Sequence, residues 1–254
     1  MDIVIIGSGN VAAVLGRKFK AANHNIVQIF SRNASAASAL AYEFNTESTN
    51  YKSMIHKTAD VYLIAVADDA INDVVTELRL PGKVVAHTAA SVPKEILKTV
   101  TEHYGVFYPL QSLRKEMTDL PDIPIFFDGS DDVAKMKLES LAHSIAKVKV
   151  VQASDDDRLK LHVAAVVVSN FTNHLYVLAA EYCRKEGLDF KQLLPLIEET
   201  ALRIKNTSPE LAQTGPAIRH DKETIQKHIE LLKNHPQLKN LYVLLTESIQ
   251  QVKL

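Results

Sequence analysis

The chain has 254 residues, 46% of them hydrophobic, and its 29 basic and 30 acidic side chains leave a formal net charge of −1. This composition is typical of a soluble globular protein with one large or two smaller domains. The balanced charge argues against a nucleic-acid partner. The single cysteine, Cys183, excludes an internal disulfide framework and a cysteine-based zinc site, and it fits a reducing compartment.

No signal peptide or membrane span is predicted. The N-terminal residues carry no basic stretch ahead of an apolar run. The longest apolar run, around residues 163–168, is far shorter than the roughly 20 residues that span a bilayer. We therefore expect a cytoplasmic protein without a membrane partner.

The first part of the chain alternates short apolar runs with helical patterns. Strands are predicted over 3–6, 25–30, 61–66, 84–87, 105–108, 125–127 and 148–151, and helices over 11–22, 34–44 and 131–146. Strands that alternate with helices favour parallel pairing with helices on both faces of the sheet. The fold class is therefore α/β, with a mostly parallel sheet.

From Ser154 the pattern is helical to the end of the chain. Ser154 is the predicted N-cap, and the three aspartates that follow favour the first turn through the helix dipole rather than forming a metal or catalytic cluster. This helix is expected to stop at Gly187. Further helices are predicted over 188–205, with a kink at Pro195, over 221–234 and from 236 onward. The expected domains are residues 1–151 and an all-helical part, residues 152–254.

The run Gly7-Ser8-Gly9-Asn10-Val11-Ala12 follows the first predicted strand and opens the first helix. It fits G-x-G-x-x-A, in which the first glycine permits a tight turn, the second lets the backbone approach a diphosphate, and the small last residue lets helix pack on strand. These six residues predict a dinucleotide-binding Rossmann domain over residues 1–151. The alternative is a Rossmann fold that keeps the turn but binds nothing.

The end of the second strand should select the cofactor. Dinucleotide sites for NAD usually place an acidic residue there, whereas this chain has Ser31-Arg32-Asn33. Arginine offers a planar fork for a 2′-phosphate, so Ser31 and Arg32 favour NADP over NAD. The alternative is that Arg32 stacks on the adenine or faces solvent.

Two later strand ends should face the same crevice, because ligands of parallel sheets bind outside the carboxyl ends of the strands. Ala65, Val66 and Ala67 would pass close to the cofactor, as would Thr88. His87 ends an apolar strand. It is a candidate substrate ligand, and a hydrogen-bonded structural histidine is at least as good an interpretation.

The combination of motifs resembles a family of Rossmann-like proteins with a C-terminal domain of unknown function, number 2520. Those proteins are relatives of pyrroline-5-carboxylate reductase, ketopantoate reductase, 6-phosphogluconate dehydrogenase-like enzymes and deazaflavin-dependent NADP oxidoreductases. The resemblance covers nearly the whole chain. It rests on 7–12, 65–69, 87–88, 108–112, His162, 169–171, 214–216 and 219–221. It implies a helical C-terminal domain like that of 6-phosphogluconate dehydrogenase, a nicotinamide held by the first domain, a substrate between the domains, and a homodimer through the C-terminal helices.

Several relatives place a catalytic lysine on the long helix, ahead of an asparagine. Here the comparable place holds His162, and Lys160 lies two residues off that face. Histidine side chains titrate near neutral pH, so His162 is a candidate proton donor. Seven residues separate His162 from Ser169, which puts both on one face of a regular helix together with Asn170 and Asn173. The alternative is polar registration between packed helices.

The remaining candidates belong to loops. Tyr108, Gln111 and Ser112 follow a strand end and would line the crevice, unless they form a plain connection. Arg219 follows Gly215-Pro216 and would present a cation to a substrate carboxylate or phosphate, unless this is a surface turn before a helix cap. The histidines show no metal-binding spacing, so no metal is expected.

These observations favour an NADP-dependent oxidoreductase. It would transfer a hydride between the nicotinamide and a small carbonyl, imine or hydroxy-acid substrate. Because the lysine is missing, an NADP-binding regulatory or sensor protein without turnover is the alternative. A structural dimer module with a vestigial crevice is a third possibility. The sequence does not identify the substrate.

Overall fold

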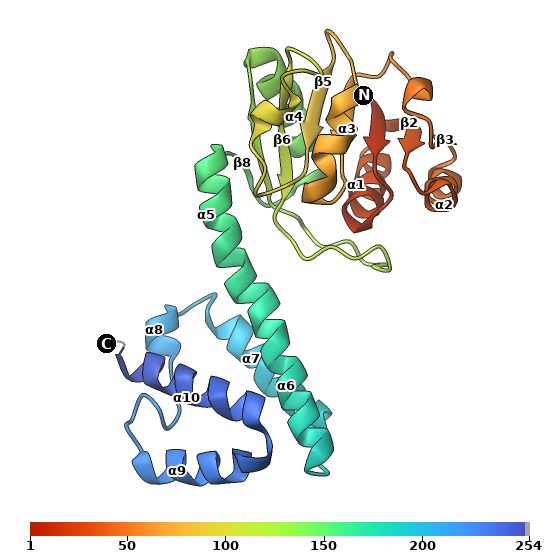
Figure 1. The fold of residues 1–254 in the computed structure, drawn as a ribbon. Helices are drawn as coiled ribbons and strands as arrows, with labels where there is room; N and C mark the ends of the chain where they lie inside the picture. The colour runs from red at the N-terminus through yellow and green to blue at the C-terminus, as the bar shows by residue number, and fades with distance from the viewer. Residues whose placement is uncertain (252–254) are drawn as a thin grey trace. The chain divides into compact units, whose positions relative to one another are not determined.

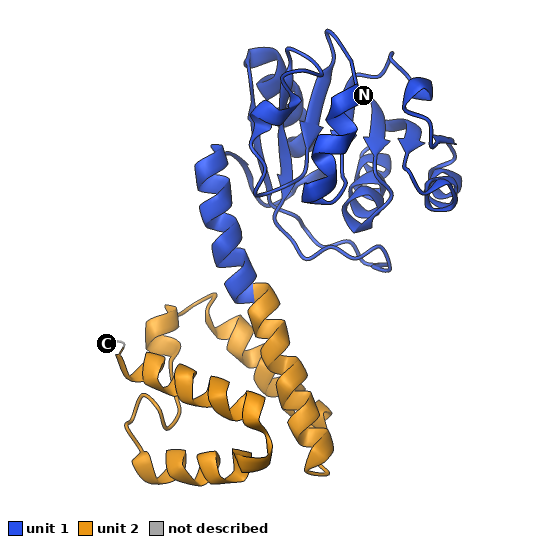
Figure 2. Cartoon of the chain, viewed as in Figure 1, with its two compact units in different colours: residues 1–168 blue, residues 169–254 orange. Residues whose placement is uncertain are grey.

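A computed structural model describes residues 1–251, which belong to two compact units (Figure 2). Unit 1 comprises residues 1–168, and unit 2 begins at residue 169. The helix that begins at Asp155 therefore belongs to unit 1 over its first turns. The domain boundary expected between residues 151 and 152 stays a prediction.

Unit 1 contains one eight-stranded sheet with the order β3-β2-β1-β4-β5-β6-β7-β8 (Figure 1). The strands are β1 Asp2–Ile6, β2 Asn25–Phe30, β3 Glu47–Thr49, β4 Val61–Ile64, β5 Val84–His87, β6 Tyr104–Pro109, β7 Ile125–Gly129 and β8 Val150–Gln152. All neighbouring pairs are parallel except β6 with β7. The predicted mostly parallel sheet is thus confirmed. The strand order reverses at β1, the point where such sheets form their ligand crevice.

Helices cover both faces of the sheet. They are α1 Asn10–Ala21, α2 Ala34–Phe44, α3 Ile71–Glu77 and α4 Asp132–Ile145. The helices α1, α2 and α4 share a buried core with Ile3 and Ile5, whereas α3 packs in a second core with Val4 and Ile6. Because successive side chains of a strand point to opposite faces, the continuous apolar run of β1 is buried on both sides.

Strand β3 and helix α3 are not predicted from the sequence. Glu47 and Ser48 of β3 are exposed, so no apolar pattern marks this edge strand. Helix α3 has seven residues, which is two turns and too few to establish a helical period. Both elements were missed because they are short rather than because their residues disfavour the conformation.

The predicted long helix is confirmed, with an irregularity near its middle. Helix α5 (Asp155–Ala165) continues through a π-helical segment, Val166–Phe171, into α6 (Thr172–Lys185). Ser154 is the N-cap as predicted, and its hydroxyl accepts the amide hydrogen of Asp157. Gly187 adopts φ +71° after the last turn, as expected of a residue that ends a helix. The π-helical turn changes the angular advance per residue, so spacing by seven no longer guarantees a shared face.

By length and composition alone, the helix Asp155–Lys185 could also cross a membrane, and 6% of its most apolar window is buried. A subunit-interface helix has the same two properties. This single helix is therefore weak support for a membrane protein.

Unit 2 consists of helices with very few buried side chains. Beyond α6 it contains α7 Leu194–Arg203, α8 Pro209–Ala212, α9 Lys222–Leu231 and α10 Pro236–Gln251. The expected kink at Pro195 is wrong. The chain forms a separate 3-10 turn, Phe190–Leu193, and Pro195 lies in the first turn of α7, where its missing N–H removes no helical hydrogen bond.

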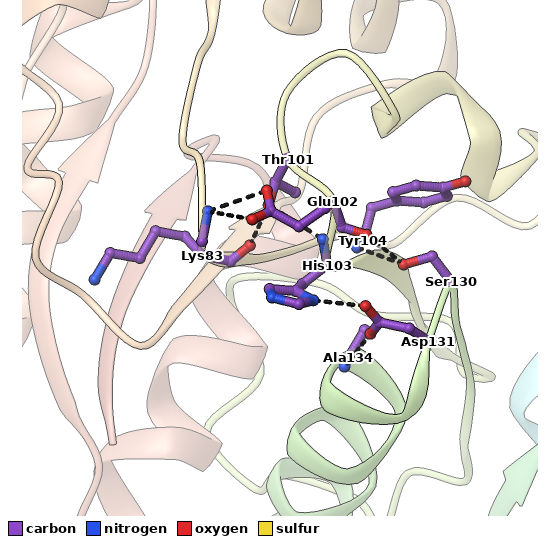
Figure 3. Close-up of polar contacts among 9 residues, drawn as sticks. Lys83, Thr101, Glu102, His103, Tyr104, Ser130, Asp131 and Ala134 are labelled. Carbon is purple, nitrogen blue, oxygen red and sulfur yellow. Dashed lines mark hydrogen bonds and ion pairs between the residues drawn. The ribbon is translucent and has the colours of Figure 1, made fainter.

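In unit 1, a polar cluster links the amino-terminal ends of β5 and β6 (Figure 3). Thr101 donates to the Lys83 carbonyl at 2.7 Å, and the Ser130 hydroxyl joins β6 to the end of β7. Asp131 caps α4 by accepting the Ala134 amide hydrogen at 2.9 Å, and it lies 2.6 Å from His103. The Asp131 carboxylate thus caps α4 and also contacts His103, the residue before β6.

We expect Asp131→Ala to lower the free energy of unfolding by about 1 kcal/mol, because an unreplaced helix cap costs that much. The backbone amide of Ala134 and the contact with His103 hold the pKa of Asp131 below its ordinary value. The stabilisation is therefore present at neutral pH and declines as the pH falls through the lowered pKa. Urea unfolding at pH 7 and pH 3 measures both effects. Ser140→Ala, an exposed change on the same helix, is the control, and an equal loss in both variants would contradict the capping role.

Candidate functional site

A pocket of about 380 Å³ lies in unit 1, outside the carboxyl ends of β1, β2 and β4. Its lining residues are Gly7, Ser8, Gly9, Asn10, Val11, Phe30, Ser31, Arg32, Ala65, Val66, Ala67, Ala70 and Val74. Of the predicted cofactor residues, only Ala12 and Thr88 are outside this set. Ala12 is fully buried in the core under α1, and the amide of Thr88 donates to the Ile64 carbonyl. Phe30, Ala70 and Val74 were missed because apolar residues of a strand end and a short helix carry no motif.

The turn between β1 and α1 excludes a side chain at Gly7. This residue has φ +132°, and a Cβ there would lie 2.1 Å from the Ala65 carbonyl oxygen. At Gly9 a Cβ would meet nothing within 4 Å. Gly9 is also the N-cap of α1 and offers no capping side chain. The first amide groups of the helix therefore face a space that a ligand phosphate can enter.

The end of β2 presents the groups expected to meet a 2′-phosphate. The Ser8 hydroxyl donates to the Ser31 hydroxyl at 2.9 Å. The side chain of Arg32 is 71% exposed and lies 3.6 Å from the equally exposed Asp73. Such an exposed pair is worth little, so Arg32 is available to a ligand. Asn33 accepts the Ala36 amide hydrogen and fixes the start of α2 beside it.

Tyr108 and His162 form a hydrogen-bonded pair in unit 1. The Tyr108 hydroxyl lies 2.9 Å from Nδ1 of His162. The two ring centroids lie 6.0 Å apart in an edge-to-face arrangement. Tyr108 comes from the carboxyl-terminal half of β6, and His162 comes from the second turn of α5. Burial raises the pKa of Tyr108, and nearby Asp68 adds to this against the opposing charge of Arg158. The tyrosine is therefore a neutral hydroxyl that orients the histidine ring.

His87 is fully buried beneath the loop that follows β5. Its Nδ1 accepts the Ala89 amide hydrogen at 3.2 Å. Burial, reinforced by the charge of Arg158, lowers the pKa of His87 to about 4. The ring is therefore neutral near pH 7 and shapes the loop from below.

Arg158 is the main feature that the sequence analysis missed. Only 1% of this residue is exposed, yet its guanidinium donates to the Ala90 and Val92 carbonyls at 3.1 and 2.7 Å. It also pairs with Asp155 at 2.7 Å. Burial alone would raise the pKa of Asp155, but the Arg158 charge outweighs it and the pKa is lowered. The three-residue spacing of Asp155 and Arg158 is the sequence signal for this pair, whereas the aspartate was predicted only to stabilise the first turn through the helix dipole.

The other predicted substrate residues lie elsewhere. Gln111 and Ser112 are exposed after β6, where the Gln111 side chain accepts the Ser112 amide hydrogen. Four residues belong to unit 2: Ser169, Asn170, Asn173 and Arg219. Ser169 and Asn170 lie in the π-helical segment, and Asn173 and Arg219 are exposed. The structure brings Tyr108 to His162, and the joint action of these unit 2 residues with that pair stays a prediction. Across residues 1–251, no three His, Cys, Asp or Glu side chains group to hold a metal.

A parallel sheet with a glycine turn, an uncapped helix N-terminus and a basic group after β2 defines the class of Rossmann-fold dinucleotide-binding proteins. Comparisons of the chain with protein families agree with this class. Residues 123–249 match the "Domain of unknown function (DUF2520)", and residues 2–91 match "NADP oxidoreductase coenzyme F420-dependent". No curated protein matches. The chain belongs to the DUF2520 family.

Solved structures extend the likeness over the whole chain. A Bacteroides fragilis protein described as an NADP oxidoreductase is 36% identical, with TM-score 0.89 and coverage of 99% of this chain and 98% of that one. An imine reductase from Myxococcus stipitatus in complex with NADP+ is 13% identical, with TM-score 0.69 and coverage of 99% and 93%. A 1-pyrroline-5-carboxylate reductase from Streptococcus pyogenes is 14% identical, with TM-score 0.65 and coverage of 99% and 99%. The last two share the fold.

The two glycines of the turn give a matched pair of variants. We expect Gly7→Ala to lower the free energy of unfolding by about 1–3 kcal/mol, because the new methyl group meets a carbonyl and the φ angle is strained. We expect Gly9→Ala to unfold like the wild type and to bind dinucleotide more weakly, because its methyl group enters the open space over the turn. Denaturant titration and calorimetry measure the two effects. Equal stability of both variants would contradict the described turn.

Proposed function

We propose that the protein is an NADP-dependent oxidoreductase that transfers a hydride between the nicotinamide and a small carbonyl, imine or hydroxy-acid substrate. The observation that carries the proposal is the pocket at the glycine turn, lined also by Ser31 and Arg32, in the same unit as the Tyr108–His162 pair. The family description and the structural neighbours support the cofactor and the class of reaction. The imine reductase and pyrroline-5-carboxylate reductase neighbours favour a C=N bond as one substrate type.

The residues of the pocket fit NADP. Gly9 and the amide groups at the start of α1 would hold the diphosphate. Ser31 and Arg32 would hold the 2′-phosphate, and Phe30 and Val74 would offer apolar contact. The bound nicotinamide would supply the hydride, which carries two electrons to the substrate carbon.

His162 is the proposed proton donor. In the imidazolium form it would pass one proton to the substrate oxygen or nitrogen as the carbon receives the hydride, and it would become neutral. The Tyr108 hydroxyl would orient the ring through Nδ1, which leaves Nε2 as the donating atom. Solvent would restore the proton. Running in reverse, the neutral ring would accept a proton from a hydroxy acid.

The substrate is proposed to lie between the domains. On the side of unit 1, Gln111 and Ser112 would contact the substrate. His87, which is buried beneath the loop after β5, would shape the substrate site from below. Ser169, Asn170, Asn173 and Arg219 are the proposed polar contacts from the helical part. A cytoplasmic location stays part of the proposal, supported by the single free cysteine.

The decisive experiment combines binding with turnover. We expect NADPH at a hundredfold excess over its Kd to stabilise the protein by about 2.7 kcal/mol in a thermal-shift assay, and NADH to act more weakly. With a keto acid or cyclic imine that is turned over, His162→Gln should lower kcat by about 10²- to 10⁴-fold and leave NADPH binding intact.

Lys160→Met is the control for that experiment, because Lys160 lies on the same helix with its side chain largely exposed and paired with Asp156. It should keep wild-type kcat. Tyr108→Phe should keep part of the activity, because the His162 ring would lose only its orienting contact. If NADPH binds but no carbonyl, imine or hydroxy acid is turned over, the sensor alternative is supported. If no dinucleotide binds, both functions are excluded.

We also propose that the protein is a homodimer through its C-terminal helices. In unit 2 the buried apolar side chains are limited to Leu178, Cys183, Ala217 and Leu232 among the described residues. Large apolar side chains are exposed on most of its helices, for example Phe171, Leu196, Leu211 and Leu244. An isolated unit with so small a core would be unstable, and patches of this kind mark protein interfaces. A second copy would offer the matching apolar faces.

We expect light scattering after size exclusion to give twice the mass of the chain. Phe171→Asp, at a position that is 60% exposed, should shift the protein to monomer or lower its stability, because the charge would be buried at the interface. Tyr42→Asp, at a position in unit 1 that is 90% exposed, is the control and should leave the dimer intact. A stable wild-type monomer would exclude the homodimer. Cosedimentation with lipid vesicles would assign the apolar helix to a membrane instead.

A further inference from the structure

We propose that Lys115 contacts the 2′-phosphate of NADP and is a second cation for it beside Arg32. This inference rests on the proposed function and adds a residue that lies outside the glycine motif and the end of β2. It comes from the β6–β7 loop, residues 110–124, which joins the antiparallel pair of strands.

The β6–β7 loop is anchored near both of its ends. Its ends meet where the Leu110 amide donates to the Pro124 carbonyl at 2.9 Å. Leu113 and Ile123 are buried in the core of unit 1 with α1 and α2. Figure 1 shows the loop as the yellow-green segment that extends toward α1. Apolar contacts thus hold the loop against the Rossmann domain, although the loop has no regular secondary structure.

Two residues of α1 fix the backbone of Lys115. The Asn10 side-chain oxygen accepts the Lys115 amide hydrogen at 3.1 Å, and Arg17 donates to the Lys115 carbonyl at 2.7 Å. Arg17 is itself held by both carboxylate oxygens of Glu43. Asn10 is part of the glycine motif, so the loop is tied to the helix turn that would hold the cofactor diphosphate. The position of Lys115 is therefore set by the cofactor site.

Lys115 lines a second hollow of about 330 Å³, between α1 and α2, together with Ser8 and Ala36. Ser8 also lines the dinucleotide pocket, and its hydroxyl contacts that of Ser31. The two hollows therefore adjoin at the end of β2, with Arg32 lining one and Lys115 the other. A 2′-phosphate beside Ser31 would come within reach of both cations.

The charges around Lys115 leave its ammonium available to a ligand. Two carboxylates line the same hollow, Glu43 and Glu116. Glu43 is held by Arg17, and Glu116 makes an exposed contact with Arg114 at 3.7 Å. Within residues 1–251 the Lys115 ammonium has no ion pair of its own. Lysine binds phosphate as a mobile point charge, which suits a site whose backbone is fixed and whose side chain is free.

The test compares Lys115→Met with Arg114→Met, a neighbouring cation of the same loop that does not line the hollow. Binding of NADP+ and NAD+ to the full chain is measured by calorimetry. We expect Lys115→Met to weaken NADP+ about tenfold and to leave NAD+ unchanged, and Arg114→Met to change neither. Two fragments that cannot be turned over should behave in the same way. Lys115→Met should weaken the binding of adenosine 2′,5′-bisphosphate and leave that of adenosine 5′-phosphate unchanged.

Three results would overturn the assignment of Lys115 and leave the proposed function standing. Equal weakening of both dinucleotides would place Lys115 at the diphosphate, and unchanged binding would leave it without a cofactor role. A wild-type protein that binds NAD+ as well as NADP+ would remove the 2′-phosphate site while leaving the oxidoreductase proposal standing. Failure of the wild type to bind either dinucleotide would instead reject the proposed function, and the inference with it.

Arg17 supplies a separate check on how Lys115 is held. If Arg17 acts as a positioning residue for Lys115, then Arg17→Gln should weaken NADP+ and leave NAD+ unchanged. The double variant with Lys115→Met should then bind NADP+ no more weakly than Lys115→Met alone, because the two changes remove one interaction. Fully additive losses would show that Arg17 does not act through Lys115.

Discussion

The close contact between the first turn and the neighbouring strands is the constraint on which the dinucleotide pocket depends. The Gly7 amide donates to the Phe30 carbonyl of β2 at 2.7 Å, and the Ala65 amide donates to the Ile6 carbonyl of β1 at the same distance. The ends of three strands are thereby held within hydrogen-bonding distance. Only a residue without a Cβ fits between them, since even a methyl group would strike the Ala65 carbonyl. The N-terminus of α1 can then face the pocket.

A buried charge organises the other side of the unit. Arg158 lies at the end of the first turn of α5, and its guanidinium donates to the carbonyls of the loop after β5. Placing a guanidinium in the interior is costly, and it is tolerated only with a partner and with satisfied hydrogen bonds. Asp155 supplies the opposite charge at Nη1, and the Ala90 and Val92 carbonyls accept from Nε and Nη2, so Nη1 is held by the ion pair alone. The consequence is that α5 starts in a defined position against the sheet, and the same helix one turn later presents His162 to Tyr108.

The sequence predicted what depends on strong local patterns. Continuous apolar runs marked the central strands, and Ser154 and Gly187 marked the ends of the long helix. The glycine motif located the floor of the pocket. The elements that were not predicted have weak local patterns, such as β3, an exposed edge strand of three residues. The hydrogen bond between Tyr108 and His162 was not predicted either, because 54 residues separate them and a local pattern carries no information on a contact of that range.

Desolvation separates the roles of the basic residues in this nearly neutral chain. Arg158 is removed from water, so its hydrogen bonds must be made within the protein, and it cannot also serve a ligand. Arg32 is largely in water and gives up only a weak exposed contact with Asp73 when an anion arrives. Lys115 is also exposed, and it differs from Arg32 in that α1 holds its backbone through Asn10 and Arg17. A net charge near zero therefore says little about phosphate binding, because the outcome depends on which cations keep their charge accessible.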